Sequence, residues 1–424
     1  MNEERLLETK LKDIENVVNS QQKKRIRITR GILDGRMAYT GPIQVEICVS
    51  DLCNNSCLAC WQYSPLIKKG YSTYFDPNKR NKLLQFDIFK KAVDDLHDLD
   101  VQIIRITGMG EPLQNPDIID MVRYVKSYGI FCSINTNGTL ITREMIDKFC
   151  QIGLDRIDLS LWAGSAKAYV ETHPNQSEKT FYHIKDWLNH LADIKHSYNN
   201  KPDALLINVI FNKNYNDVEN MIKFAIETRV NRMYLNPVDT NENTRELLLN
   251  KEELDVLRCN VKNSISQLKD SSLRHNICGF LESLNCQGAS DGKFDFNIYD
   301  NNYRCYHGWV HSRILADGRV VPCGFTNNLV MGDINEKSFK EIWNSDKYQE
   351  FREKCIIGMN DDYFSTSCCQ RNCVYFRVNQ RIHEGICVVK NNMDNLKIYP
   401  SSRNIYFWLK EIDPILERKM FYNY

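Results

Sequence analysis

The sequence predicts an α/β protein, a partial (β/α)6 TIM-like barrel followed by a small C-terminal cysteine-rich domain. Between residues 41 and 240, short β-branched apolar runs alternate with longer segments of helical period, which is typical of βα units around a parallel sheet. Six units are too few to close the common eight-stranded barrel, so we expect another part of the chain to cover the open side. The candidate strands are residues 45–49, 103–107, 130–135, 156–161, 205–211 and 232–236.

Helices are predicted between these strands, several of them beginning at a capping side chain. Asn115 followed by Pro116 predicts a cap with a proline at the first helical position. The expected helix starts lie near Phe86, Pro116, Thr142, Ser177 and Asn216.

Composition divides the chain into five segments. Residues 1–40 are expected to form a helical extension, 41–240 the barrel, 241–302 connecting helices, 303–390 the cysteine-rich domain and 391–424 a tail helix. The polar stretch that ends near residue 302 is the expected boundary between the two domains.

Charge and hydropathy exclude several classes of protein. A formal net charge of +1 offers no basic surface of the size that nucleic-acid binding needs, and we expect the basic run from Lys23 to Arg30 to be a solvated segment. The first thirty residues lack the apolar core of a signal peptide, and no later stretch is long and apolar enough for a membrane span. A cytoplasmic protein with sixteen cysteines is expected to use them as metal ligands or redox thiols.

Three cysteines follow the first predicted strand in a C-x3-C-x2-C arrangement, Cys53, Cys57 and Cys60. Three thiolates on one loop can bind three irons of a 4Fe-4S cube and leave the fourth iron open to a substrate or cofactor. The alternatives are buried cysteines without a ligand role, or a zinc site in which Cys48 is the fourth thiolate, although Cys48 falls inside the strand.

This triplet resembles the defining motif of the radical S-adenosylmethionine (SAM) superfamily, with Ala59 where an aromatic residue is common. The resemblance implies that the amino and carboxylate groups of SAM chelate the open iron of a 4Fe-4S cluster. It also implies that a reductant such as flavodoxin or ferredoxin delivers an electron, and that SAM is then cleaved to a 5'-deoxyadenosyl radical.

The second strand ends in Gly108-Met109-Gly110-Glu111-Pro112. Glycines at a strand end let the backbone approach a ligand closely, and a carboxylate there can pair with an ammonium group. The segment is similar to the GGEP motif of the same superfamily. That similarity implies that Gly110 and Glu111 contact the SAM amino group, with Gly108 in the same cofactor-binding turn.

The next strand ends offer further contacts for SAM. Asn135 and Ser160 carry amide and hydroxyl groups where the superfamily binds the SAM ribose and carboxylate, and we assign these contacts to them. The fifth strand has no glycine-rich sequence, so we expect its backbone near Val209 and Phe211 to lie beside the adenine.

A second cysteine block begins at Cys305, and the spacing of Cys305, Gly318 and Cys323 resembles the opening of the SPASM domain or its shorter relative, twitch. The intervening Asp-Gly pair predicts a hairpin turn that brings the two thiolates together. The resemblance implies an auxiliary 4Fe-4S cluster bound by Cys305, Cys323, Cys369 and Cys373, with Cys368 able to replace its neighbour. A second cluster from Cys355, Cys368 and Cys387 stays open, as does a structural zinc site.

The expected function is abstraction of hydrogen from a substrate C–H bond, for oxidation, dehydrogenation or epimerisation of a sugar-like or other small molecule. Forty residues before the first strand are too few for a leader-binding domain, so modification of a peptide or protein is the alternative. A non-enzymatic iron-sulfur carrier or metal-binding scaffold would leave Gly110-Glu111-Pro112 without a role. No catalytic acid or base is identified, and no nucleic-acid or membrane partner is expected.

Overall fold

A computed structural model provides the structure of the chain. It describes residues 3–16, 18–68, 82–269, 271–286, 288–292, 304–326, 328–358, 362–364, 373, 375–392 and 412–413. Within these ranges, no helix combines the length and the apolar character that crossing a membrane requires.

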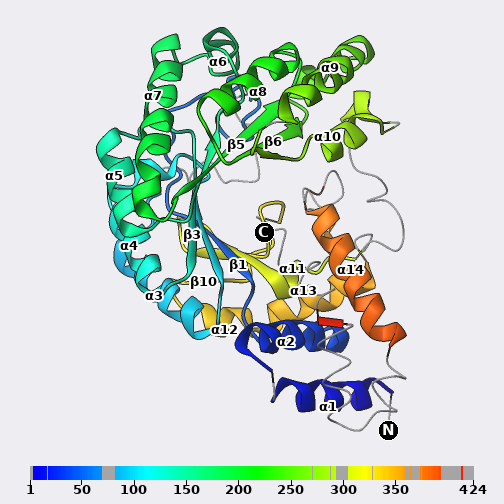
Figure 1. The fold of residues 1–424 in the computed structure, drawn as a ribbon. Helices are drawn as coiled ribbons and strands as arrows, with labels where there is room; N and C mark the ends of the chain where they lie inside the picture. The colour runs from blue at the N-terminus through cyan, green and yellow to red at the C-terminus, as the bar shows by residue number, and fades with distance from the viewer. Residues whose placement is uncertain are drawn as a thin grey trace.

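The fold is built on a ten-stranded sheet whose order is β10-β9-β8-β1-β2-β3-β4-β5-β6-β7 (Figure 1). From β1 to β7 the strands are parallel and consecutive. The six predicted strands are confirmed as β1 to β6, each to within one or two residues at its ends. The strands are β1 (Gln44–Cys48), β2 (Ile103–Thr107), β3 (Phe131–Thr136), β4 (Arg156–Ser160), β5 (Asp203–Ile210), β6 (Arg232–Pro237), β7 (Arg274–His275), β8 (His311–Ile314), β9 (Arg319–Val321) and β10 (Gly332–Asp333).

Helices cover the outer face of this sheet, with α3 to α8 forming an arc around it in Figure 1. The helices are α1 (Glu3–Glu15), α2 (Ser20–Asp34), α3 (Phe86–Asp98), α4 (Ile118–Ser127), α5 (Arg143–Ile152), α6 (Ala166–Thr172), α7 (Glu178–Ile194), α8 (Val218–Glu227), α9 (Lys251–Ser264), α10 (Ile277–Leu284), α11 (His307–Val310), α12 (Phe339–Trp343), α13 (Asp346–Ile357) and α14 (Phe376–Asn391). Side chains alternate along each strand, so Val45 and Ile47 of β1 join the apolar core beneath the helices. Glu46 and Cys48 of the same strand therefore face the barrel interior.

The cap predicted at Asn115 and Pro116 is wrong, because α4 begins two residues later, after Asp117. The Asn115 amide donates to the carbonyls of Val49 and Leu84, at 2.9 and 3.0 Å, and its Oδ1 accepts from the Asp117 N–H. Asn115 therefore ties the loop after β2 to the loop after β1 instead of capping a helix.

The cysteine-rich segment joins the barrel sheet directly. β8 pairs in parallel with β1, Arg313 opposite Glu46, and the β8–β9 hairpin turns at Gly318, whose φ of +95° favours glycine. The predicted hairpin is thus confirmed. The segments on the two sides of the expected boundary near residue 302 both contribute strands to one sheet.

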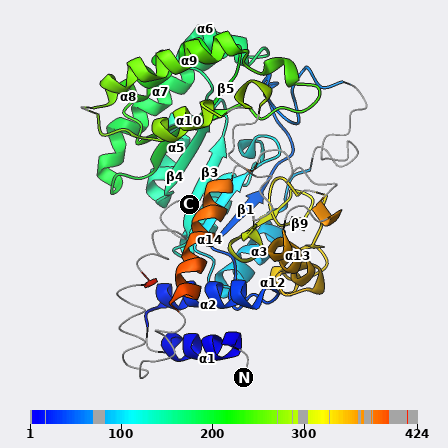
Figure 2. The ribbon, with the colours of Figure 1, turned by 90° about the vertical axis from the view of Figure 1, so that its right-hand side faces the viewer.

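The open side of the barrel is covered by α14, which lies in front of β1 and β3 in Figure 2. Arg377 of α14 pairs with Glu282 of α10 at 3.1 Å, and Asn379 accepts a hydrogen bond of 2.7 Å from the Tyr306 N–H. This helix therefore connects the two edges of the opening. The tail predicted for residues 391–424 lies almost entirely outside the described residues.

The basic run is not a solvated segment, because α2 packs against the barrel and buries much of it. Lys24 and Arg25 are 1% and 3% exposed. Arg25 Nε lies 2.7 Å from Asp413 Oδ1, and Lys24 Nζ lies 3.9 Å from Asp100. Paired carboxylates, rather than water, compensate these charges.

Candidate active site

The three cysteines of the C-x3-C-x2-C loop lie beyond the carboxyl end of β1, near enough for the charges of Cys53 and Cys60 to act on the Cys57 thiol. Burial, together with the charges of the neighbouring thiols, raises the pKa of Cys57 well above its ordinary value. The N–H groups of Gln62 and Tyr63 point at Cys60 Sγ, at 3.4 and 3.3 Å, and the Asn55 N–H lies 3.4 Å from Cys53 Sγ. Donors aimed at sulfur suit thiolates that bind a cluster, because they stabilise the anionic form.

The loop is fixed from the opposite side by the segment that follows α6. Asn175 and Gln176 donate to the Asn54 carbonyl at 2.9 and 3.1 Å. The Leu58 N–H donates to the Thr172 carbonyl at 3.0 Å. Sequence reasoning missed these contacts, since nothing in the motif indicates which distant segment holds it.

The glycines after β2 lie against the backbone of the cysteine loop. The Gly110 N–H donates to the Ser50 carbonyl at 3.1 Å, and a Cβ at position 110 would lie 2.1 Å from the Leu52 carbonyl oxygen. At Gly108 a Cβ would lie 2.6 Å from the Ser50 carbonyl oxygen. Both glycines thus allow two backbones to approach each other, in addition to any contact with a ligand.

Glu111 is 1% exposed, and its carboxylate accepts hydrogen bonds from the end of β3. Thr136 Oγ1 donates at 2.6 Å and the Asn137 N–H at 2.7 Å, while the Leu113 N–H adds a third bond. Burial raises the pKa of Glu111 to about 7. Its carboxylate therefore joins β2 to β3, and contact with the SAM amino group stays a prediction.

The other expected SAM contacts lie at the same edge of the sheet. Asn135 and Ser160 end neighbouring strands, and among the described side chains Asn135 Oδ1 is buried without a hydrogen-bond partner. Phe211 and Val209 belong to a small apolar cluster with Ala59 of the cysteine loop. An unpartnered acceptor and an apolar cluster at the same edge of the sheet fit a nucleoside, which needs both.

The second cysteine block brings together thiols from three elements. The Cys305 pKa is raised well above its ordinary value, first by a hydrogen bond with Cys355 and then by burial. Burial, with the charge of Cys305, raises the pKa of Cys323 to about 11. Cys355 therefore lies with Cys305 and Cys323, whereas Cys387 on α14 lies 3.6 Å from His383 Nε2. Cys373 is partly buried beside the core, and Cys368 and Cys369 lie outside the described residues.

The described cysteines can be compared with the ligand set of a single metal ion. In the described part of the chain, no three His, Cys, Asp or Glu side chains gather closely enough to bind one metal ion. The ligands of a 4Fe-4S cube are attached to separate irons and stand farther apart. The ligand set of the second group therefore stays a prediction, as does the zinc alternative.

The barrel interior carries a charged network that sequence reasoning missed. Arg105 of β2 lies between Glu46 and Asp158, with Nη distances of 3.5 and 3.1 Å. Arg313 of β8 lies 3.6 Å from Glu46, and Arg156 pairs with Asp158. A charged residue at the central position of each strand, as in QVEIC, IIRIT and RIDLS, was the available signal.

The sequence matches the radical SAM superfamily model over residues 47–225 and the SPASM iron-sulfur cluster-binding domain model over residues 305–374. A tungsten-containing aldehyde ferredoxin oxidoreductase cofactor-modifying protein of Pyrococcus furiosus is 25% identical over 63% of this chain and 75% of its own length. An AdoMet-dependent heme synthase of Methanosarcina barkeri is 25% identical over 71% of this chain and 82% of its own.

Solved structures share the fold. SuiB of Streptococcus suis bound to S-adenosylmethionine aligns with a TM-score of 0.56 at 16% identity, covering 81% of this chain and 75% of SuiB. Native anSMEcpe with bound AdoMet aligns with a TM-score of 0.51 at 15% identity, over 84% of this chain and all of the other. With the cysteine loop, the glycine turn and the second thiol group in these positions, the chain belongs to the radical SAM superfamily and carries a C-terminal SPASM domain.

Proposed function

We propose that this enzyme oxidises a small polar molecule bound in the barrel interior, by abstraction of a hydrogen atom from one of its C–H bonds. SAM bound at the first cluster supplies the abstracting 5'-deoxyadenosyl radical. Loss of one electron and one proton from the resulting carbon radical completes a two-electron oxidation, and the electron needs an acceptor close to the substrate. The second cysteine group supports a cluster in that role.

One side chain carries this proposal, because Arg313 spans the distance between the two cofactor regions. Its Nη2 lies 3.3 Å from Met109 Sδ, within the glycine turn, and its Nη1 would lie 2.5 Å from a Cβ at Gly324, next to Cys323. A substrate beside Arg313 therefore lies between the SAM turn and the second cysteine group. The protein's part is to orient the substrate there and to exclude water.

Modification of a peptide is the second candidate. PqqA peptide cyclase of Ruegeria pomeroyi is 22% identical over 72% of this chain and 75% of its own length. SuiB bound to its precursor peptide SuiA has a TM-score of 0.56 with this chain. These names support a peptide substrate, whereas the charged barrel interior supports a small polar one.

The test of radical chemistry needs no substrate. The protein is reconstituted anaerobically with iron and sulfide, reduced with dithionite and incubated with SAM, and 5'-deoxyadenosine is quantified by mass spectrometry. We expect product from the native chain and none from Cys57→Ala. The control is Cys259→Ala, which removes an exposed thiol on α9 and should leave product formation unchanged. A fully loaded native protein that binds SAM but forms no product would favour the carrier or scaffold.

A further inference from the structure

The charged groups of the barrel interior are paired unevenly. Among the described residues, the ion pairs of the interior join the guanidinium groups of Arg105, Arg156 and Arg313 to the two carboxylates of Glu46 and Asp158, and the carboxyl group of Asp51 also interacts with Arg313. Burial alone would raise the pKa of Glu46, yet Arg313, His311 and Arg105 together lower it below its ordinary range, so this carboxylate is ionised. Arg105 and Arg313 therefore share the Glu46 carboxylate, in a region where a guanidinium group without close acceptors is costly.

Arg313 is the guanidinium with the weakest partners. Its Nε donates to Cys48 Sγ at 3.1 Å and its Nη2 to Met109 Sδ at 3.3 Å, and sulfur is a weak acceptor. Burial raises the pKa of Cys48 to about 11, so this thiol is neutral and does not neutralise the arginine. The nearest carboxylate oxygen, Glu46 Oε2, is 3.6 Å away, while Arg105 and the Tyr375 hydroxyl face Oε1 of the same carboxylate.

Neighbouring polar atoms are also without partners. Within the described residues, Arg105 Nε and Ser133 Oγ are buried and form no hydrogen bond. Register sets Arg105 beside Ser133, on the same face as Glu46. The Arg105 side chain keeps 22% of its surface free of protein contact although β2 is a central strand, so there is space beside it in the barrel interior. Unpartnered donors in an accessible interior indicate a polar ligand.

We propose that Arg313 and Arg105 bind an anionic group of the substrate, a carboxylate or a phosphate, between the glycine turn and Cys323. The proposal deepens the proposed function and rests on it. Guanidinium groups form paired, charge-assisted hydrogen bonds with both kinds of oxyanion, which sulfur atoms cannot replace. Such an anion would give Arg313 oxygen acceptors beside its two sulfur partners and would fix the orientation of the reacting C–H bond.

The test measures anion binding by the reconstituted full-length protein in the presence of saturating SAM. The unfolding midpoint is recorded as potassium chloride is replaced by potassium acetate or potassium phosphate at constant ionic strength. Tenfold above the dissociation constant, we expect a rise of roughly 2 °C in the native protein. The acetate and phosphate series distinguish the two oxyanions.

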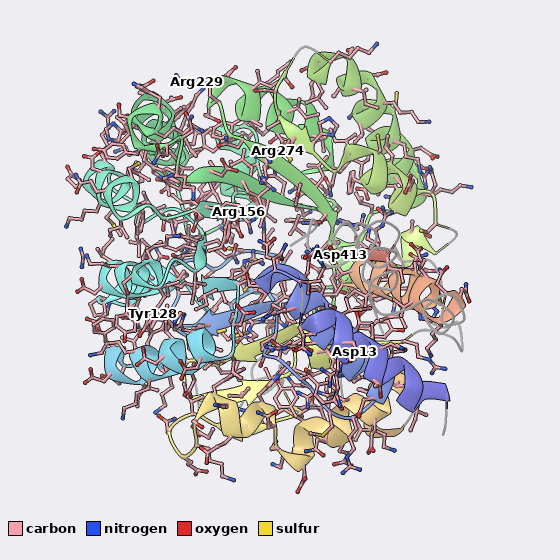
Figure 3. All side chains as sticks on the ribbon, turned by 60° about the horizontal axis from the view of Figure 1, so that its bottom comes forward. Asp13, Tyr128, Arg156, Arg229, Arg274 and Asp413 are labelled. Atoms are coloured by element: carbon pink, nitrogen blue, oxygen red, sulfur yellow. The ribbon has the colours of Figure 1, made fainter. Side chains whose placement is uncertain are left out.

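Three variants make the test specific. Arg313→Gln should abolish the rise, and Arg313→Lys, which keeps the charge on a side chain of similar length, should retain less than half of it. Arg229→Gln is the matched control, because Arg229 pairs with Asp193 at an exposed site. In Figure 3 Arg229 lies toward the rim of the molecule, whereas Arg156, a member of the same interior network as Arg313, lies near the centre. This control should respond as the native protein does.

Three results would overturn the proposal. The native protein could lack the rise, or Arg313→Gln and Arg313→Lys could both retain it in full. Alternatively, Arg313→Gln could weaken SAM binding tenfold or more in equilibrium dialysis. Arg313 would then bind the carboxylate of SAM and not an anionic group of the substrate. Failure of the proposed function is a separate result, since it shows as absent 5'-deoxyadenosine whether or not anions bind.

Discussion

The two cysteine groups of this molecule are assembled in opposite ways. Cys53, Cys57 and Cys60 lie on one short loop, and neighbouring N–H groups point at their sulfur atoms. Cys305, Cys323 and Cys355 come from the start of the C-terminal domain, the β8–β9 hairpin and the end of α13. The first group is specified by spacing along the chain, whereas the second exists only once the fold has formed.

The two groups therefore depend on different parts of the structure. A compact loop can hold its thiols as long as its own backbone contacts persist, so damage to it should act through the contacts with Gly110 and α6. The dispersed group depends on the packing of three elements, and its membership can be decided only by removing one thiol at a time.

The largest expected effect comes from removing thiols of the dispersed group. Cys323→Ser and Cys355→Ser should each lower the iron content by about four per chain, the content of one cluster, and should leave substrate-independent SAM cleavage within a few-fold of the native rate. Iron and 5'-deoxyadenosine are measured on the same samples. Cys278→Ser, at an exposed site on α10, is the control. If Cys355→Ser keeps its full iron content, Cys355 is not a ligand of this cluster.

The compact group is tested by Gly110→Ala. The added methyl would lie 2.1 Å from the Leu52 carbonyl oxygen, so we expect a loss of more than about 2 kcal/mol in the free energy of unfolding and displacement of the loop that carries Cys53. Urea unfolding and the electron paramagnetic resonance signal of the reduced first cluster measure the two effects. Gly129→Ala, where nothing lies within 4 Å, should cost only about 1 kcal/mol for its φ of +70°. Equal losses in the two variants would contradict this account.

A smaller effect concerns the stability of the folded protein at acidic pH. Burial lowers the pKa of His173 to about 4, and His173 follows Thr172, whose carbonyl holds the cysteine loop. The unfolded chain binds a proton below about pH 6.5 while the folded chain does not, so His173 makes the protein less stable as pH falls from 6.5 toward 4. At pH 5.5 the loss is about 1 kcal/mol. His173→Gln should remove this part of the pH dependence, and His275→Gln, at an exposed position, should not.

Local features were the ones that the sequence could predict. The six barrel strands and the cysteine loop follow from residues close together in the chain, and Thr142 caps α5 as expected. The burial of Lys24 and Arg25 could not be predicted, because their partners Asp100 and Asp413 lie far away in the sequence. Charges at the centres of β1, β2 and β4 were visible, but only strand register shows that they meet in one interior.

The pairing of β8 with β1 has a consequence for the order in which the chain folds. β1 is among the first strands to be synthesised, and one of its two neighbours arrives only with residues 311–314. Until then its edge is unpaired and Glu46 lacks Arg313, so the barrel cannot reach its final form during most of synthesis. A chain that stops before β8 would keep every residue of the first cysteine loop and the glycine turn, and would still present an open strand edge beside them.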